Sequence, residues 1–371
     1  MGLSVFLILF VLMGSVSAIN DNITDLSQDT DNAITQEKIS TGNDDSSLKE
    51  IENNELLKTN PENTTLKTLV GGNTFADIQT VIDSAASGDT LELTGLYKGS
   101  GTPVIIDKNN LTIVGNDAIL DAQGQSRIFN ITGTGIILKN IGFINGNATD
   151  NGGAIYWYGA NGTISNSNFV NNTAESNGGA IYTAESLTLN NVTFISNYAS
   201  KNGGAVAVYE DVTINCNSSE FFDNYAGEGG SSIVVGKGKL NLYNSCITSK
   251  IYAKAGQVMG STDAQFYLEN ITFANTTATY SPAIYLVGSK IKIIDSKFIN
   301  LKANLTAGAM SLREGGELYI SNCEFINTTS SRNAGAVYVD ITGYNPGNEG
   351  NVTIIDSKFK DASSEFGGAY V

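Results

Sequence analysis

The chain has 371 residues, of which 40 are Gly, and its 37 acidic against 21 basic side chains give a formal net charge of −16. This acidity makes nucleic acid and anionic membrane surfaces poor partners. The chain has no His and only three Cys, so the ligand spacing of a zinc site is absent.

The first 18 residues, MGLSVFLILFVLMGSVSA, contain an apolar stretch that ends in small residues at Ala18. This pattern predicts a secretory signal peptide, and the alternative is a membrane anchor that stays in place. The stretch is shorter than the roughly 20 residues that a membrane-spanning helix needs. We therefore expect export with cleavage, and no membrane span in the mature chain.

Residues 19–67 carry 11 acidic and 4 basic side chains and few aromatic ones. Such a segment buries too little apolar surface to fold, so it is predicted to be a disordered acidic linker. The packed domain is expected to span residues 68–371.

The domain opens with a segment that favours a helix. The run NTFADIQTVIDSAASG predicts an amphipathic helix from Phe75 to Ala86, with Asn73 or Thr74 as its N-cap and Gly88 ending it. We expect this helix to cover the open end of a stack of strands. Early strands are predicted at Thr90–Leu93, Val104–Ile106, Leu111–Val114, Ile119–Asp121 and Ile136–Leu138.

A repeat with a period of about 26 residues follows, and a period of this length is typical of stacked repeat architectures. One signature is Gly-Gly-Ala or a variant, beginning at Gly152, Gly178, Gly203, Gly229, Ser281, Ala307, Ala334 and Gly367. The second signature is a column of phenylalanines, namely Phe143, Phe169, Phe194, Phe221, Phe273, Phe298, Phe325 and Phe359. The repeat from Lys239 to Gly260 keeps only the spacing.

The repeats consist of short alternating runs such as LTLNNVTF, which favour strands over helices. After each Gly-Gly-Ala the first and third positions are apolar, as at Ile155 and Trp157, so they share one face, most simply the interior. Short strands that cannot bury their apolar faces alone are stable when stacked on copies of themselves. The sequence therefore predicts an all-β parallel β-helix of about 10–11 coils, with the Phe column inside.

A small polar residue lies three positions before each Phe. Asn and Asp tolerate left-handed backbone conformations, and their side chains bond to nearby backbone, so this column predicts tight turns. Gly before the strand serves the same purpose at lower steric cost. The column consists of Asn140, Asn166, Asn191, Ser218, Asn270, Asp295, Asn322 and Asp356.

The paired GGA(I/V) and FxxN signatures resemble the polymorphic outer-membrane protein repeat of chlamydial surface proteins. With ADIQTVIDSAASGDTLEL, TIVGNDAILDAQ and FINGNATDNGGAIYWYGANGTISNSNF, the chain is similar to adhesin-like proteins of methanogenic archaea over about 68–371. The resemblance implies a secreted, right-handed β-helix of the pectate-lyase-like fold that mediates attachment at a cell surface. Because the chain stops at GGAYV inside a repeat, we expect the natural C-terminus to be missing here.

The alternative is a carbohydrate-active enzyme, a polysaccharide lyase or hydrolase, because pectate lyases and polygalacturonases share this fold. Such chemistry needs converging carboxylates, or an Arg beside a calcium-binding acidic cluster. The domain has only three Arg, namely Arg127, Arg313 and Arg332, and no His. The residue inventory therefore favours a non-enzymatic protein without a cofactor.

One acidic group is a candidate for metal binding. Glu185 and Glu210 occupy equivalent positions of successive repeats, and Asp211 is adjacent. Stacked carboxylates can bind calcium or share a proton. The alternative is that these side chains are solvated and point apart.

The three cysteines allow two interpretations. Cys216 and Cys246 lie near equivalent places in successive repeats and could form a disulfide outside the cell, which would leave Cys323 without a partner. The simpler interpretation is three small buried thiols.

A column of tyrosines is the candidate binding surface. The outward second position of the strand after Gly-Gly-Ala holds Tyr156, Tyr182, Tyr285 and Tyr338, and Tyr158 flanks the first of them. Tyrosines give contact area at little entropy cost, so the column predicts a platform for sugar rings or another protein. The alternative is that the rings merely cover the sheet and support one another.

Asn-x-Ser/Thr sequons are candidate glycosylation sites in an exported chain, although an Asn-rich composition alone produces many of them. They include Asn110, Asn130, Asn161, Asn191, Asn270 and Asn351. We expect a secreted or cell-surface adhesin-like glycoprotein, whose partner is an extracellular glycan or a protein on another cell or host surface. A passive cell-wall component is a further possibility.

Overall fold

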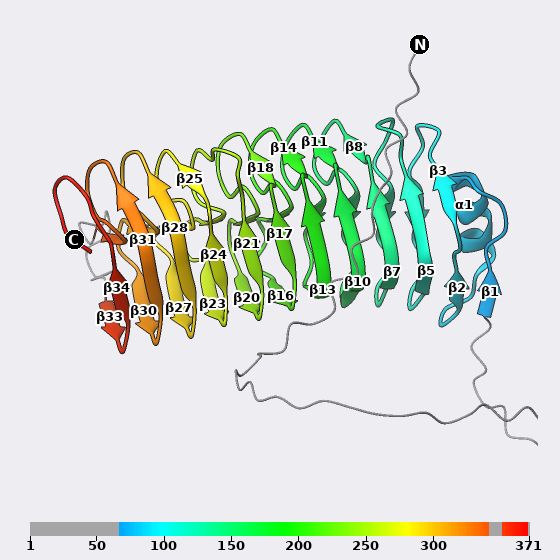
Figure 1. The fold of residues 1–371 in the computed structure, drawn as a ribbon. Helices are drawn as coiled ribbons and strands as arrows, with labels where there is room; N and C mark the ends of the chain where they lie inside the picture. Colours follow the sequence, from blue (N-terminus) through cyan, green and yellow to red (C-terminus); the bar gives the residue numbers. More distant parts are fainter. Residues whose placement is uncertain (1–66, 341–350, 370–371) are drawn as a thin grey trace, which may run out of the picture. The chain divides into compact units, whose positions relative to one another are not determined.

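The structure is a computed structural model that describes residues 67–340 and 351–369. The predicted signal peptide and the predicted linker up to residue 66 lie outside the described residues. From Lys67 onward the chain winds into a right-handed parallel β-helix, whose coils stack along one axis (Figure 1). The predicted fold class is confirmed.

Before the coils comes the one helix of the described residues, α1 (Phe75–Ser84). It begins with a capping box, in which the Thr74 side chain accepts a hydrogen bond from the Asp77 N–H and the Asp77 carboxylate accepts one from the Thr74 N–H. The helix stops before the predicted Ala86, because the backbone of Ala85 is already extended. Its existence and its N-cap agree with the prediction.

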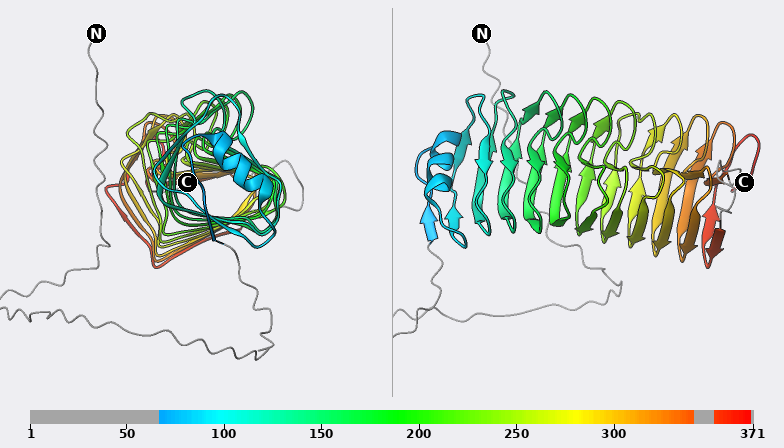
Figure 2. Two further views of the ribbon diagram at one scale, coloured as in Figure 1. Left: turned by 90° about the vertical axis from the view of Figure 1, so that its right-hand side faces the viewer. Right: turned by 180° about the vertical axis from the view of Figure 1, so that it is seen from behind.

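This helix closes the N-terminal end of the stack, across which it lies when the coils are viewed end-on (Figure 2). Its apolar face buries Phe75, Ile78 and Ile82. The Gln79 side chain donates to the Ile105 carbonyl at 3.2 Å and accepts from the Ile105 N–H at 2.7 Å. Because Ile105 lies in the first strand of its sheet, Gln79 satisfies backbone groups that no preceding coil can reach.

Ten short parallel strands, most of which follow a Gly-Gly-Ala or its variant, form one sheet, and their number agrees with the predicted number of coils. We call it the ten-stranded sheet. Its strands are β4 (Val104–Ile106), β6 (Phe129–Ile131), β9 (Ile155–Trp157), β12 (Ile181–Thr183), β15 (Val206–Val208), β19 (Ile233–Val235), β22 (Val258–Gly260), β26 (Ile284–Val287), β29 (Met310–Arg313) and β32 (Val337–Val339).

The other strands form two further sheets, of which the smaller is present in four coils only. A four-stranded sheet contains β8 (Asn147–Ala148), β11 (Thr173–Ala174), β14 (Tyr198–Ala199) and β18 (Tyr225–Ala226). The large sheet contains β1 (Lys67–Leu69), β2 (Thr90–Glu92), β3 (Leu96–Lys98), β5 (Thr112–Asp121), β7 (Ile137–Ile144), β10 (Gly162–Val170), β13 (Leu187–Ile195), β16 (Thr213–Asn217), β17 (Glu220–Phe222), β20 (Lys239–Tyr243), β21 (Cys246–Thr248), β23 (Gln265–Glu269), β24 (Thr272–Ala274), β25 (Thr277–Ala278), β27 (Lys290–Ile294), β28 (Lys297–Ala303), β30 (Glu317–Ser321), β31 (Glu324–Ser330), β33 (Asn351–Ile355) and β34 (Lys358–Lys360).

The early strands differ from prediction in two ways. Leu111–Val114 and Ile119–Asp121 belong to one strand, β5, whose register shifts between Val114 and Ala118. The three-residue strands β1, β3 and β6 were not predicted, although β2 and β4, which are equally short, were.

The large sheet bends where the small polar column lies. Every member of that column has a positive φ, between 49° and 56°, and Asn244 supplies the same corner in the repeat that lacks both signatures. Amide side chains bond along the stack, for example from Asn191 to Asn166 at 2.9 Å and from Asn270 to Asn244 at 2.8 Å. The corner therefore combines a left-handed backbone with a ladder of side-chain bonds.

The Asn of the FxxN signature forms a second, buried ladder. Asn172, Asn197 and Asn224 are almost fully buried. Asn172 donates to Asn197 and Asn197 to Asn224, each at 2.9 Å, and Asn197 also donates to the Phe169 carbonyl at 3.0 Å. The signature is thus a set of buried polar groups whose hydrogen bonds run from coil to coil.

The Phe column lies inside the coils, and its rings stack face to face. Phe169 and Phe194 have ring centroids 5.1 Å apart and planes inclined by 13°. The stack is interrupted once, at Ile247, which pairs in register with Phe221 on one side and Phe273 on the other. Burial of each ring contributes roughly 1.5–3 kcal/mol to folding.

The paired glycines have different tasks. Gly152 has φ 71°, so it makes the left-handed turn. At Gly153 the backbone of the next coil comes so close that a Cβ atom would lie 2.1 Å from the Gly179 carbonyl oxygen. One glycine therefore turns the chain and the other lets neighbouring coils touch.

The three cysteines are free. Cys216 pairs in register with Leu242, whereas Cys246 pairs with Glu220, so the two thiols belong to different columns. Cys216 and Cys323 are buried and Cys246 is half-buried. Burial raises the pKa of the Cys216 thiol to about 12 and that of Cys323 to about 11.

Candidate functional site

The tyrosine column lies on the outer face of the ten-stranded sheet, but it is discontinuous. Tyr156 and Tyr182 pair in register, and Tyr285 and Tyr338 lie further along the same column. All four rings are half-buried. The coils between them present the smaller residues Ala207, Val234, Met259 and Ser311 at this position.

Near the N-terminal end the rings form a continuous group, which we call the tyrosine strip: Tyr158, Tyr156, Tyr182 and Tyr209. Successive ring centroids are 4.6, 5.0 and 6.4 Å apart. The hydroxyl groups of Tyr156 and Tyr158 share a hydrogen bond, and Tyr158 is 52% exposed. Tyr209, which the sequence did not single out, joins the strip from the following coil and donates to the Asn177 side chain at 3.1 Å.

One end of the strip is held by Arg127. Its guanidinium lies 5.0 Å from the centre of the Tyr156 ring, and it also forms an ion pair with Asp150. The guanidinium further donates to the Asn130 side chain at 3.0 Å. Arg127 therefore fixes Tyr156 against the sheet.

Burial raises the pKa of the Tyr156, Tyr182 and Tyr209 hydroxyls. Burial is the main cause for Tyr156, with the bond to Tyr158 second. It also raises the pKa of Tyr182, and that of Tyr209 to about 12. These three hydroxyl groups are thus uncharged at neutral pH, and the strip can offer ring faces and hydroxyl groups to a ligand.

Tyr285 and Tyr338 are separate from the strip. The Tyr285 hydroxyl accepts a hydrogen bond from Arg313 at 3.0 Å, and its ring lies 5.7 Å from that of Tyr280. This bond raises the pKa of Arg313. Tyr156, Tyr158 and Tyr182 therefore belong to the strip, whereas Tyr285 and Tyr338 lie outside it.

The acidic candidates lie in turns between the strands. From Thr183 to Leu187 the chain advances four positions, whereas from the paired Val208 to Ile214 it advances six, so the later turn is two residues longer. Glu185 and Glu210 consequently lie in unequal turns outside the paired strands. Within residues 67–340 and 351–369, no group of three or more His, Cys, Asp or Glu could hold a metal ion.

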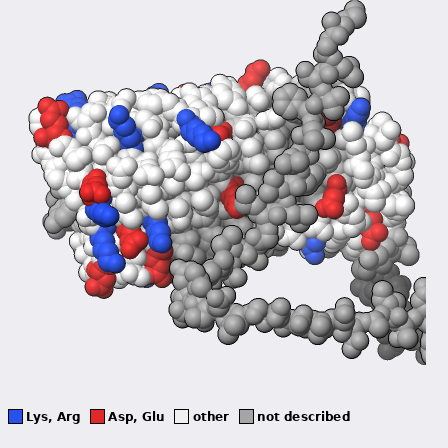
Figure 3. Space-filling model, in the orientation of Figure 1, with Lys and Arg blue, Asp and Glu red and all other residues white. Residues whose placement is uncertain are grey.

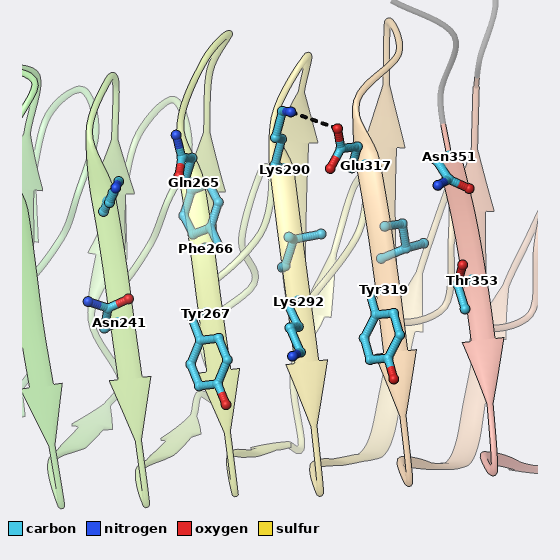
Figure 4. Close-up of a pocket in the computed structure, with 13 residues that line it drawn as sticks. Asn241, Gln265, Phe266, Tyr267, Lys290, Lys292, Glu317, Tyr319, Asn351 and Thr353 are labelled. Carbon is cyan, nitrogen blue, oxygen red and sulfur yellow. Dashed lines mark hydrogen bonds and ion pairs between the residues drawn. The ribbon is translucent and has the colours of Figure 1, made fainter.

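A second candidate site, which the sequence did not reveal, lies on the large sheet. It is a depression of about 620 Å³ over β20, β23, β27, β30 and β33, and we call it the lysine groove (Figure 4). Its outward-facing side chains are Lys239, Asn241, Gln265, Tyr267, Lys290, Lys292, Glu317, Tyr319, Asn351 and Thr353. On the face seen in Figure 3, charged side chains of both signs gather over these C-terminal strands.

Two segments, residues 166–184 and 191–209, match the family model of the Chlamydia polymorphic membrane protein repeat. The chain therefore carries two segments that are similar to this repeat. These segments contain Tyr182 and Tyr209 of the strip, together with the buried ladder residues Asn172 and Asn197. No curated protein is significantly similar to the chain.

Several solved structures are similar to the chain at low identity and low TM-score. They include the catalytic unit of a GH87 alpha-1,3-glucanase from Streptomyces thermodiastaticus (12% identity over 81% of this chain and 70% of that one, TM-score 0.39). Alginate lyase AlyF-OU02 in complex with G6 has 11% sequence identity over 83% of this chain and 87% of that one, with a TM-score of 0.33. The SRRP of L. reuters 100-23 has 12% sequence identity over 83% of this chain and 99% of that one, with a TM-score of 0.29.

Among the described residues, no helix combines the length and apolar character needed to cross a membrane.

Proposed function

We propose that the chain is an exported, adhesin-like surface protein that attaches to a glycan or a protein on another cell or host surface through the tyrosine strip. The observation that carries this proposal is the continuous run of four rings over three coils, with Tyr158 half exposed at its end. Rigid aromatic rings on a flat sheet provide contact area at little entropy cost. The matching repeats, which contain two of the rings, support the same assignment.

The test is adhesion of the purified chain to immobilised glycans and to cells. The double variant Tyr156→Ser/Tyr182→Ser is expected to lose at least tenfold in adhesion while keeping its far-UV circular dichroism. The matched control is Tyr198→Ser/Tyr225→Ser, which removes another stacked pair, 5.8 Å apart, from the four-stranded sheet. Equal adhesion by both double variants and the parent would disprove a role for the strip.

The same experiment separates an adhesin from an enzyme of the same fold. Glycans that are retained without cleavage support attachment, whereas release of reducing or unsaturated ends would support a lyase or hydrolase. Export and glycosylation belong to the proposal too. Five of the six named sequons, Asn110, Asn161, Asn191, Asn270 and Asn351, are exposed and thus accessible to a transferase. A mass change after glycosidase treatment would identify them.

A further inference from the structure

We propose that the lysine groove binds a linear acidic polysaccharide, whose chain runs across the strands along the axis of the β-helix. The groove lies on the large sheet, whereas the tyrosine strip lies on the ten-stranded sheet. The two sites are tested independently, because each can bind or fail to bind whatever the other does.

The register of the strands gives the groove its direction. Lys239, Gln265, Lys290, Glu317 and Asn351 are paired in succession, so they form a straight row with one side chain per coil. Adjacent strands are about 4.8 Å apart, and five of them extend over roughly 20 Å. An extended polymer lying along this row meets a new side chain at every coil, whereas a compact ligand meets only a few.

A second row provides ring faces on either side of a cation. Tyr267, Lys292 and Tyr319 lie on consecutive strands, and the Lys292 ammonium is 5.7 Å from one ring centre and 5.3 Å from the other. The Tyr267 hydroxyl donates to Glu269 at 2.9 Å, which fixes the ring. Both rings turn a face outward in Figure 4, and such faces stack against the apolar faces of sugar rings.

The charges of the groove favour an anionic ligand. Three lysines line it against one glutamate, in a chain of net charge −16. Glu317 is engaged by Lys290, whose ammonium lies 2.6 Å from its carboxylate. Within the described part of the chain, Lys239 and Lys292 form no ion pair with a carboxylate. The carboxylates of a uronic-acid chain would supply the missing partners.

The remaining lining fits the hydroxyl groups of a sugar. Asn241, Gln265, Asn351 and Thr353 offer amide and hydroxyl groups along both rows. In the earlier coils the row of Tyr267 continues as Thr163, Thr188 and Asn215, which are small and uncharged. Aromatic and basic side chains are therefore combined in this row only in the C-terminal coils.

The test measures binding of the full chain to a galacturonic acid decamer and to a hyaluronan decamer by titration calorimetry. A carboxyl-reduced galacturonate decamer is the matched neutral ligand. We expect it to bind at least tenfold more weakly than its acidic parent, and we expect acidic binding to weaken as salt rises. Equal affinity for the acidic and neutral decamers, or no binding of either acidic decamer, would overturn the proposal.

Variants locate the site. Lys292→Met and the double variant Tyr267→Ala/Tyr319→Ala are each expected to lose at least fivefold in affinity, with an unchanged thermal midpoint as the folding control. Lys139→Met is the matched control, because Lys139 is an exposed, outward residue of β7 in the same sheet. Tyr156→Ser/Tyr182→Ser is expected to keep full affinity for the acidic decamer. Normal binding by the Lys292→Met variant would contradict the assignment.

Discussion

The inner phenylalanines and the outer tyrosines are two columns built on the same register, yet they differ in what their rings can do. Phe169 and Phe194 are fully buried and nearly parallel, with centroids 5.1 Å apart. Tyr156 and Tyr182 are similarly close, at 5.0 Å, but their planes are tilted by 43° and both rings keep part of their surface exposed. The repeated phenylalanines thus stabilise the core of the β-helix, whereas the repeated tyrosines form part of its outer surface.

The largest loss of stability is expected from removing a ring of the inner phenylalanine column. Phe194→Ala removes a buried ring between Phe169 and Phe221, and it is expected to lower the free energy of unfolding by about 3–5 kcal/mol. Guanidinium chloride titration followed by circular dichroism measures this loss. Tyr198→Ala, at a ring that is 39% exposed, is the control and should cost less than about 1 kcal/mol. Similar losses in both variants would contradict the distinction between inner and outer rings.

The second-largest loss of stability is expected from a substitution in the buried asparagine ladder. Asn197→Ala removes a donor to the Phe169 carbonyl and the acceptor of the Asn172 N–H, and a buried polar group left unsatisfied costs about 1–3 kcal/mol. We therefore expect a loss of about 3 kcal/mol in the same titration. Asn190→Ala, at an outward position of β13, is the matched control and should change stability by less than about 0.5 kcal/mol. A loss below about 1 kcal/mol for Asn197→Ala would mean that water replaces the ladder.

The third prediction concerns stability at alkaline pH, where a thiol that is buried in the folded chain and exposed to solvent in the unfolded chain titrates at different pH values. Burial raises the folded-state pKa of the Cys216 thiol to about 12, above the 9.0 of an unperturbed thiol, so between these pH values the unfolded chain binds fewer protons than the folded one. Stability is complete below pH 9 and falls as pH rises toward 12, by about 1.4 kcal/mol per pH unit for one thiol. Cys216→Ala should show a shallower decline between pH 9 and 11. Parallel curves for variant and parent would exclude this thiol as the cause.

The smallest effect on stability should come from the outer rings. Tyr182→Ser removes a half-buried ring that contacts Tyr156 and Tyr209, and we expect a loss of about 1 kcal/mol or less. The thermal midpoint measures it. A loss above about 2 kcal/mol would instead make the strip a covering of the sheet, which is the alternative that the sequence left open.

The fold could be predicted because its signals recur at a fixed period. A Gly or Asn that looks ordinary once becomes informative when it returns in successive coils, and the corner column from Asn140 to Asp356 has the positive φ that this pattern predicts. A second corner column, two residues after each Phe and including Asn171 and Asn300, also has positive φ but was not recognised. In the sequence it lies beside the more constant Asn of the FxxN signature.

The lysine groove could not be predicted in this way, because its row does not repeat one residue type. Tyr267, Lys292 and Tyr319 become neighbours only when the strand register is known. The period also did not reveal that the turns holding Glu185 and Glu210 differ in length by two residues. A sequence period therefore locates recurring columns, whereas mixed rows and unequal turns require coordinates.

The in-register pairing of β10 with β13 means that one whole coil can be removed from the β-helix without changing the pairing of the others. Phe169 pairs with Phe194 and Ile164 with Leu189, so each residue of one rung has its counterpart 25 positions later. Excision of residues 166–190 would join Ser165 to Asn191 with all corners, ladders and rings still in place, and the rod would be shorter by about 4.8 Å. Recombination between repeats can thus change the length of the β-helix by whole coils, while the packing of the hydrophobic core stays the same.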